Sequence, residues 1–491
     1  MIAIRELRHK QLIEKLTRSA ICRDYVRAFS ATSSVPLVLH LASWQSQSSH
    51  QRGRLRHRFS IAHSFQSHFQ EARRRVAQQL SSIISQSRMV AVHKTMPVNH
   101  VRSEYVRACC EEPFRIFFPI GVLLGVVGVS LWLFFYLGAG IPYPNIAHAR
   151  LMIEGFMASF IFGFLGTAGP RITSAPHFSL FEIATIFTLD LLAAGAHTGG
   201  AHRFGDICFA ICLLFFARML TKRFWQRKDS PPPNFVLVAL GLLSGIPGAA
   251  LLAFSENAQF STAYQFGAGL LNECFVLLPV LGVAPFFIAR LLDLPMPDLP
   301  ESRALPPGWM RQATFAALIG ITIIVSFWMD TCNFPKVGGW IRVAAITIYI
   351  AWQLPFRGRT FLANSLRAAI LSILAGFAVI ALFPIYRLGA LHIVFITGFN
   401  FIAFTVAIRV VFGHSGNLQR LLKPQWFFIA TTVLLFVAMI SRVTADLAPR
   451  IRIAHLVGAA ICWLIAGFIW IVRVIPKVMI VEPEGLTLSS K

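Results

Sequence analysis

From Phe117 onward, long apolar runs are separated by short polar loops. Most of these runs are close to the roughly 20 residues that an α-helix needs to cross a bilayer. Uninterrupted apolar runs favour helices over membrane β-barrels, whose strands alternate apolar and polar positions. The pattern predicts an all-α, polytopic membrane helix bundle over residues 111–478, with a C-terminal tail at 479–491. The twelve predicted spans are 117–138, 146–168, 178–197, 204–222, 235–254, 262–289, 312–330, 339–355, 366–385, 389–412, 425–444 and 452–474.

The second run opens with polar side chains, which are costly in a membrane unless something there uses them. His148 and Met152 are four residues apart, so they share one face of a helix. Arg150 and Glu154 share another face in the same way. Two readings stay open for these residues, an anchor at the membrane interface or a binding site.

Two features interrupt the regular pattern. The sixth run contains Pro279 and Pro285, which predict a kink or break. A Pro-rich loop, Leu292–Gly308, follows it and could divide the bundle into halves. We find no convincing internal repeat between those halves.

Composition supports the membrane assignment. Hydrophobic residues make up 56% of the 491 residues and charged residues only 13%, against about 25% in soluble domains. The net charge of +24 would suggest nucleic acid in a soluble protein. Half of the excess lies in residues 1–100, with 16 Lys/Arg and 4 Asp/Glu, and the rest lies in loops. We therefore exclude a nucleic-acid partner for the membrane part, whose partner is the lipid bilayer.

Residues 1–110 differ from the rest, being rich in Arg, Ser, Gln and His without an apolar run long enough to span a membrane. Three readings compete for this basic extension. It could be a disordered cytoplasmic arm or a transit peptide. It could also be an upstream extension from a mis-assigned start, with the true start at Met89 or Met96, which we favour.

Loop charges predict the orientation. Lys and Arg are about twice as frequent in the loops that would be inside if the N-terminus is inside. The prediction is therefore N-in and C-in. With this topology, five of the seven histidines of the membrane region fall at the outer side: His148, His197, His202, His392 and His455.

Two helices that each present a histidine at the same depth are what axial haem ligation in a bundle requires. His148 and His392 open the second and tenth spans at the outer side, so they are the candidate pair. The competing reading is that histidines collect at helix ends because they tolerate the interface. His414 lies at the inner end of the tenth span, where a cation suits the helix dipole without any ligand.

Four ionisable residues are expected to face the bundle from inside the spans: Glu182, Asp190, Glu273 and Arg409. Glu273 is the most conspicuous, beside Asn272 in an otherwise apolar helix. It could relay protons, bind a cation or pair with Arg409. Among the eight cysteines, Cys208 and Cys212 share a helix face and are best read as buried free thiols. No motif for nucleotide hydrolysis or a zinc protease is present, so an enzyme is not favoured.

At four stretches the chain resembles the NnrS family, polytopic bacterial membrane proteins associated with haem, copper and the nitric oxide response. The first resembles the family's opening FRPFF helix, the second its HAHEM motif, the third its GRVIPFFT motif, and the fourth a helix ending in GH[ST]G. These stretches are EPFRIFFPIGVLLGVVGVSLWL (Glu112–Leu133), HARLMIEGFMASFIFGFLGTAGP (His148–Pro170), VLGVAPFFIAR (Val280–Arg290) and ALHIVFITGFNFIAFTVAIRVVFGHSG (Ala390–Gly416).

The resemblance implies a location in the bacterial inner membrane and a haem or copper cofactor, with His148 and His392 as haem ligands and His148, Met152 and His414 as metal ligands. His197, at the outer end of the third span, is a further candidate metal ligand from its position alone. Pro285 and Arg409 also match family positions. The chain departs from the family pattern at several others: Arg150, Leu151, Val283 and Arg367. These departures describe a divergent member that could bind haem differently, bind one cofactor or bind none.

Three functions were compared. The first is a cofactor-binding membrane protein in nitric oxide tolerance or a denitrification-linked response. The second is a secondary transporter of a small solute or metal ion, using buried Glu273. The third, a nitric oxide reductase, ranks lowest because the chain has no cluster of histidines at the bilayer midplane.

Overall fold

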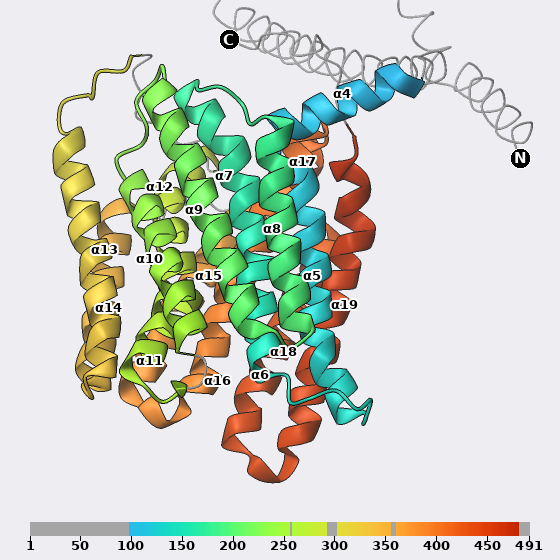
Figure 1. Ribbon diagram of the computed structural model, residues 1–491, viewed down its shortest axis with the longest axis vertical. Helices are drawn as coiled ribbons and strands as arrows, with labels where there is room; N and C mark the ends of the chain where they lie inside the picture. The colour runs from blue at the N-terminus through green and yellow to red at the C-terminus, as the bar shows by residue number, and fades with distance from the viewer. Residues whose placement is uncertain (1–97, 256–257, 292–301, 355–359, 481–491) are drawn as a thin grey trace, which may run out of the picture. The chain divides into compact units, whose positions relative to one another are not determined.

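The computed structural model describes residues 98–255, 258–291, 302–354 and 360–480, and in these ranges every regular element is a helix. The predicted all-α membrane bundle is confirmed. Of the predicted basic extension, residues 1–97 lie outside the described residues, and Val98–Glu111 form helix α4, which lies across one end of the bundle (Figure 1). Residues 481–491 of the predicted tail also lie outside the described part.

Twelve helical segments make up the bundle. They are α5 (Phe114–Tyr136), α6–η1–α7 (Asn145–Arg150, Leu151–Met157, Ala158–Thr173), α8 (Leu180–Thr198), α9 (His202–Gln226), α10 (Phe235–Phe254), α11–η3–α12 (Thr262–Ala268, Gly269–Cys274, Phe275–Leu291), α13 (Trp309–Thr331), α14 (Pro335–Gln353), α15 (Phe361–Leu382), α16–η5–α17 (Arg387–His392, Ile393–Asn400, Phe401–His414), α18 (Trp426–Leu447) and α19 (Arg452–Val478). Eleven of them have the length and hydropathy of a membrane span, and α14 does not reach that hydropathy.

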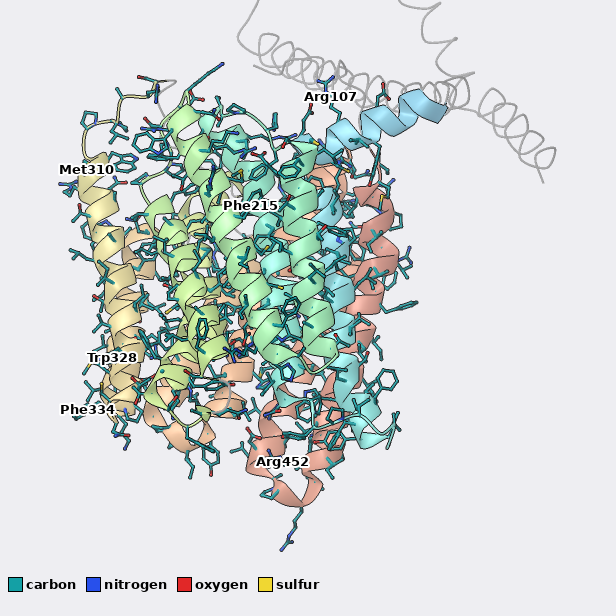
Figure 2. The ribbon with its side chains drawn as sticks, in the orientation of Figure 1. Arg107, Phe215, Met310, Trp328, Phe334 and Arg452 are labelled. Atoms are coloured by element: carbon teal, nitrogen blue, oxygen red, sulfur yellow. The ribbon has the colours of Figure 1, made fainter. Side chains whose placement is uncertain are left out.

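The start of the first helix of the bundle, α5, and the end of the last, α19, lie at the same face. Arg115, at the start of α5, donates a hydrogen bond of 2.5 Å from Nη1 to the carbonyl oxygen of Val478, at the end of α19. The chain therefore crosses an even number of times, and α14 supplies the twelfth crossing beside the eleven. We call this face the terminal end; Figure 2 shows Arg107 and Met310 near it and Trp328 and Arg452 toward the opposite end. Which end faces the cytoplasm stays a prediction.

The bundle is built from three units of four helices, not from two halves. The units are α5–α9, α10–α14 and α15–α19, and in each the last two helices are joined by a short turn, at residues 199–201, 332–334 and 448–451. Each unit packs on the next, through α9 against α10 and α14 against α15. Contact of α19 with α5 closes the ring. The Pro-rich loop at 292–308 thus falls inside the second unit and does not mark a boundary.

The second span of every unit contains a π-helical turn, η1, η3 and η5 respectively. A glycine in the preceding span allows close approach to each turn. A Cβ at Gly128, Gly248 or Gly376 would lie 3.0 Å or less from the facing helix. π-Helical turns are rare and are frequent at functional sites, so three at equivalent places direct attention to this level of the bundle.

The three interrupted spans form the centre of the bundle. The buried share of their apolar windows is 78%, 67% and 67%, whereas it lies between 33% and 50% in the other eight candidate spans. On the terminal side of the π turns, they enclose an apolar cavity of about 100 Å³. Its lining includes Phe164, Val276, Val283, Phe399 and Val406.

Of the kink or break expected at the prolines of the sixth span, the break does not occur. Helix α12 stays α-helical through Pro279 and Pro285, and the irregular backbone lies earlier, at η3. The equivalent turns η1 and η5 form without a proline close after them, so the π turn does not depend on Pro279. Gly241 of α10 makes room for the ring of Pro279, because a Cβ there would lie 2.3 Å from the proline Cδ.

Candidate functional site

A cluster of buried charged groups surrounds the first π turn. Arg150 and Glu154, which the sequence placed on one helix face, form an ion pair with Nε 3.3 Å from Oε1. Arg150 also donates a hydrogen bond of 2.6 Å to Oδ1 of Asp206, at the start of α9. Side chains of all three residues are nearly inaccessible to solvent. A buried guanidinium with two carboxylates is costly in a membrane protein unless each charge is compensated.

His197, at the end of α8, completes this group. Its Nε2 lies 2.9 Å from Oε2 of Glu154 and 3.9 Å from Oδ1 of Asp206. A Cβ at position 205 would lie 2.5 Å from the imidazole, so only glycine leaves room for this ring. The other ring nitrogen, Nδ1, lies 3.4 Å from Nδ1 of the half-buried His202, whose ring stacks on it. We call Arg150, Glu154, His197 and Asp206 the unit-1 cluster.

The unit-1 cluster holds ligand types suited to a metal ion. One ligand atom from each of Glu154, His197 and Asp206 can be chosen so that all lie within 4.8 Å of one another. Glu154 Oε1 makes no hydrogen bond within the described part of the chain, although Arg150 lies near it. Asp190, deeper along α8, accepts a hydrogen bond of 2.9 Å from Ser159 and has one oxygen without such a partner there.

The second π turn carries a cluster of different composition. Glu273 of η3 forms an ion pair with Arg387, at the start of α16, and not with Arg409 as one reading of the sequence proposed. Arg342 of α14 is completely buried and binds Asp330 of α13, with Nη2 2.7 Å from Oδ2. Arg387 lies 3.6 Å from the same Asp330 oxygen. We call Glu273, Asp330, Arg342 and Arg387 the unit-2 cluster; it pairs two carboxylates with two guanidinium groups.

The candidate haem ligands lie near each other at the opposite end of the bundle. His392 interacts electrostatically with His148, and both interact with Arg442 of α18. Nδ1 of His148 lies 3.0 Å from the carbonyl oxygen of Gly128. Nδ1 of His392 lies 2.7 Å from that of Leu388. Since a carbonyl only accepts, both rings donate from Nδ1, and each Nε2 keeps the lone pair that a metal would need.

Met152 also lies in this neighbourhood. A Cβ at Gly128 would lie 3.5 Å from the Met152 sulfur, so the thioether and the carbonyl that binds His148 belong to the same part of α5. Helix η1 thus presents Met152 toward α5, while Glu154 points to α8 and α9.

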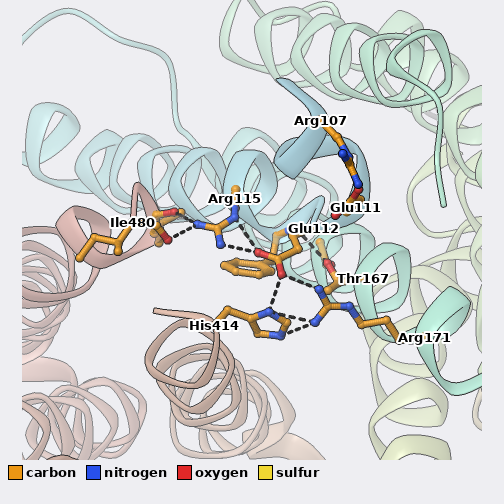
Figure 3. A network of polar contacts seen from close by, with 11 residues as sticks. Arg107, Glu111, Glu112, Arg115, Thr167, Arg171, His414 and Ile480 are labelled. Atoms are coloured by element: carbon orange, nitrogen blue, oxygen red, sulfur yellow. Dashed lines mark hydrogen bonds and ion pairs between the residues drawn. The ribbon is translucent and has the colours of Figure 1, made fainter. Parts of the chain in front are cut away.

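His414 lies at the other end of the bundle, away from the remaining candidate ligands (Figure 3). Its Nδ1 lies 2.7 Å from Oε1 of Glu112, which also binds Arg171 at 2.5 Å and pairs with Arg115. Burial alone would raise the pKa of Glu112, but the hydrogen bond and charge of His414 and the two arginines outweigh it and lower that pKa to about 2. This terminal-end cluster ties together α5, α7, α17 and α19, a structural role for His414.

Other predicted polar residues have local partners. Glu182 forms a capping box with Ser179 at the start of α8 and binds Arg223 with an N–O distance of 2.6 Å. Arg409 is half-buried in α17, next to Gly413. Neither residue lies in the unit-1 or unit-2 cluster.

The sequence reasoning missed two residues that its own rule should have found. Asp206 and Arg342 lie inside predicted spans, at 204–222 and 339–355, yet neither was counted among the ionisable groups of the spans. Asp330 and Arg387 lie at the end of a span and in a loop, where charges are ordinary. Only the packing of α13, α14 and α16 against η3 reveals their roles.

The fold and its buried charges define a multi-pass helical membrane protein with polar clusters beside the π turns of two central spans. The profile of the NnrS protein family matches residues 108–480, which is most of the chain. The chain therefore belongs to the NnrS family. No curated protein matches it.

Proposed function

We propose that this protein binds haem, copper or both in a bacterial inner membrane, and takes part in tolerance of nitric oxide or in a denitrification-linked response. The observation that carries the proposal is the arrangement of His148 and His392. The two imidazoles come from different units, lie in the helices that open two interrupted spans, and each donates Nδ1–H to a backbone carbonyl. That hydrogen bond is the usual outer-shell support of a metal-bound histidine.

The residues present fit a haem between the two histidines. His148 and His392 would hold the haem iron through Nε2, and Arg442, which pairs with Asp446, would add a positive charge near a propionate. The central apolar cavity is not the haem site, because its volume of about 100 Å³ is below the roughly 300 Å³ at which ligand pockets begin. For copper, His148 and Met152 offer an imidazole and a thioether, a set that suits Cu(I).

An optical spectrum of the full chain, purified after haem-replete expression, tests the haem proposal. We expect a Soret band that His148→Ala or His392→Ala shifts or abolishes. His455→Ala and His414→Ala are matched controls, since His455 bonds Ser441 and His414 bonds Glu112. A wild-type protein without a Soret band, or a band that neither ligand substitution changes, would contradict the proposal.

The second candidate function, a secondary transporter using Glu273, has one observation in its favour. Glu273 lies in a π turn of a central span, and its Oε2 has no hydrogen-bond partner within the described residues. Interrupted spans at the centre of a bundle are where transporters bind their substrates. Reconstituted vesicles would test it: flux of a small solute or metal ion should stop in Glu273→Gln, and unchanged flux would remove this candidate.

A further inference from the structure

The two buried acid clusters differ by one positive charge. In the unit-2 cluster, Glu273 and Asp330 face two arginines. In the unit-1 cluster, Glu154 and Asp206 face one arginine and the imidazole of His197. With the imidazole neutral, the unit-1 cluster carries a net charge of −1 inside a membrane-spanning bundle. Such a charge is costly, and either a proton on the imidazole or a bound metal cation would offset it.

We propose that Glu154, His197 and Asp206 bind a divalent first-row metal ion of the Zn²⁺ or Mn²⁺ type. One imidazole and two carboxylates are ligands that these ions accept, with bonds of about 2.0–2.2 Å for Zn²⁺. Two ligand atoms on one ion lie at most twice the bond length apart, about 4.4 Å. The three ligand atoms lie within 4.8 Å of one another, so a small inward movement of the side chains would close the site around the ion. The site is separate from His148 and His392 and does not depend on haem.

The surroundings of His197 are those of a ligand imidazole. In this structure Nε2 faces a carboxylate oxygen of Glu154 and donates to it, so a metal would replace that proton. The ring would then carry its proton on Nδ1, which faces His202 at 3.4 Å. With a metal bound, His202 would accept the hydrogen bond of that proton and orient the ring, as outer-shell partners of metal-bound histidines do. Gly205 provides the space in which the ring sits. His202 is half-buried at the start of α9, so it also marks the side from which an ion would enter.

Arg150 sets the strength of binding. Its guanidinium contacts both carboxylates, so it offers them a permanent positive charge that a metal must share. A divalent ion changes the net charge of the cluster from −1 to +1, which Arg150 opposes. Removing the Arg150 charge should therefore tighten metal binding, whereas removing any ligand should weaken it.

Zn²⁺ binding to the full chain in detergent tests the site, after treatment with a chelator and without a polyhistidine tag. Because residues 1–100 hold eight histidines, the site is measured as a difference between variants. Wild-type protein should bind one more tight Zn²⁺ than Glu154→Gln, His197→Gln or Asp206→Asn. His202→Phe should lose about 10- to 100-fold in affinity. Arg150→Met should bind Zn²⁺ more tightly than wild type.

Two controls separate this site from the others. Glu273→Gln removes the equivalent acid of unit 2 and should leave Zn²⁺ binding unchanged. His148→Ala should also leave it unchanged while altering any Soret band, so failure of the haem proposal would not affect this one. A folding check by size-exclusion chromatography accompanies each variant. Equal Zn²⁺ binding by wild type and His197→Gln, or weaker binding by Arg150→Met when it elutes like wild type, would overturn the proposal.

Discussion

The unit-1 and unit-2 clusters show how one backbone arrangement can serve two electrostatic purposes. Glu154 and Glu273 occupy matching places: each lies in a π turn and is followed two residues later by a buried phenylalanine, Phe156 or Phe275. Gly125 packs against the first ring and Gly245 against the second. The backbone thus presents a carboxylate at the same level in both units, and the partners decide what the carboxylate can do.

In unit 2 the partners are fixed cations. Arg342 lies 3.5 Å from the centre of the Phe327 ring and binds Asp330, so it is held on two sides. Arginine does not lose its proton in proteins, so two guanidinium groups balance the two carboxylates of this cluster. In unit 1 the second group that can carry a positive charge is a histidine, His197, which can gain a proton or bind a metal. The difference teaches that charge balance, not burial, distinguishes the two clusters.

The largest loss of stability is expected from replacing Arg342. Arg342→Met leaves Asp330 and Glu273 with only the half-exposed Arg387, and loss of one partner of a buried ion pair costs about 3–5 kcal/mol. Thermal unfolding should show the same loss with Zn²⁺ or with a chelator. Arg150→Met in unit 1 should be destabilised with the chelator and recover with Zn²⁺. Equal responses of the two variants to Zn²⁺ would remove the distinction between the clusters.

The terminal-end cluster lies outside the membrane spans, and its stability should depend on pH and not on Zn²⁺. The folded pKa of Glu112 is lowered to about 2 from an ordinary value of 4.5, so its stabilisation is present above pH 4.5 and lost as the pH falls toward 2. The difference corresponds to up to about 3 kcal/mol at neutral pH. Unfolding free energy measured in nanodiscs should fall over that pH window. In Glu112→Gln the fall should be absent; a profile identical to wild type would contradict the assignment.

A smaller loss should follow from filling the space beside His197. Gly205→Ala places a methyl group 2.5 Å from the imidazole, and such overpacking costs about 1–3 kcal/mol. Displacement of the ring should also weaken Zn²⁺ binding. Gly195→Ala is the matched control, because a Cβ there meets nothing within 4 Å. Thermal unfolding and Zn²⁺ titration of both variants check the prediction, and equal behaviour of the two would contradict it.

The smallest loss of stability is expected from removing the carboxylate of Glu273 in the unit-2 cluster. Glu273→Gln removes one carboxylate but leaves Arg387 partly exposed to solvent and near Asp330, so the loss should be about 1 kcal/mol. Glu154→Gln should show a similar loss with a chelator and a larger one with Zn²⁺, because it also gives up the bound ion. A Zn²⁺-dependent change in Glu273→Gln would mean that unit 2 also binds a metal.

Part of the site could be predicted because the order of the spans fixes the end of the bundle at which each helix begins. Counting spans placed His148 and His392 at one end of the bundle, and the structure has both in the helices that open an interrupted span, α6 and α16. The same counting should have excluded the pairing of Glu273 with Arg409, since the first lies early in its span and the second late in a parallel one. The threefold repeat escaped notice because Glu154, Glu273 and Thr397 share a place in the backbone but not a chemistry.

The sequence alone determined that this is a helical, multi-pass membrane protein, where nearly all the spans lie, and that charges inside them must face the bundle. It could do so because lipid acts on each segment separately, through its length and apolarity. Only the tertiary structure decided which charges meet. The partners of Glu154 come from α6, α8 and α9, and those of Glu273 come from neighbouring helices and α16. The charge balance of each cluster therefore depends on how these helices pack and on the rotation that each π turn imposes.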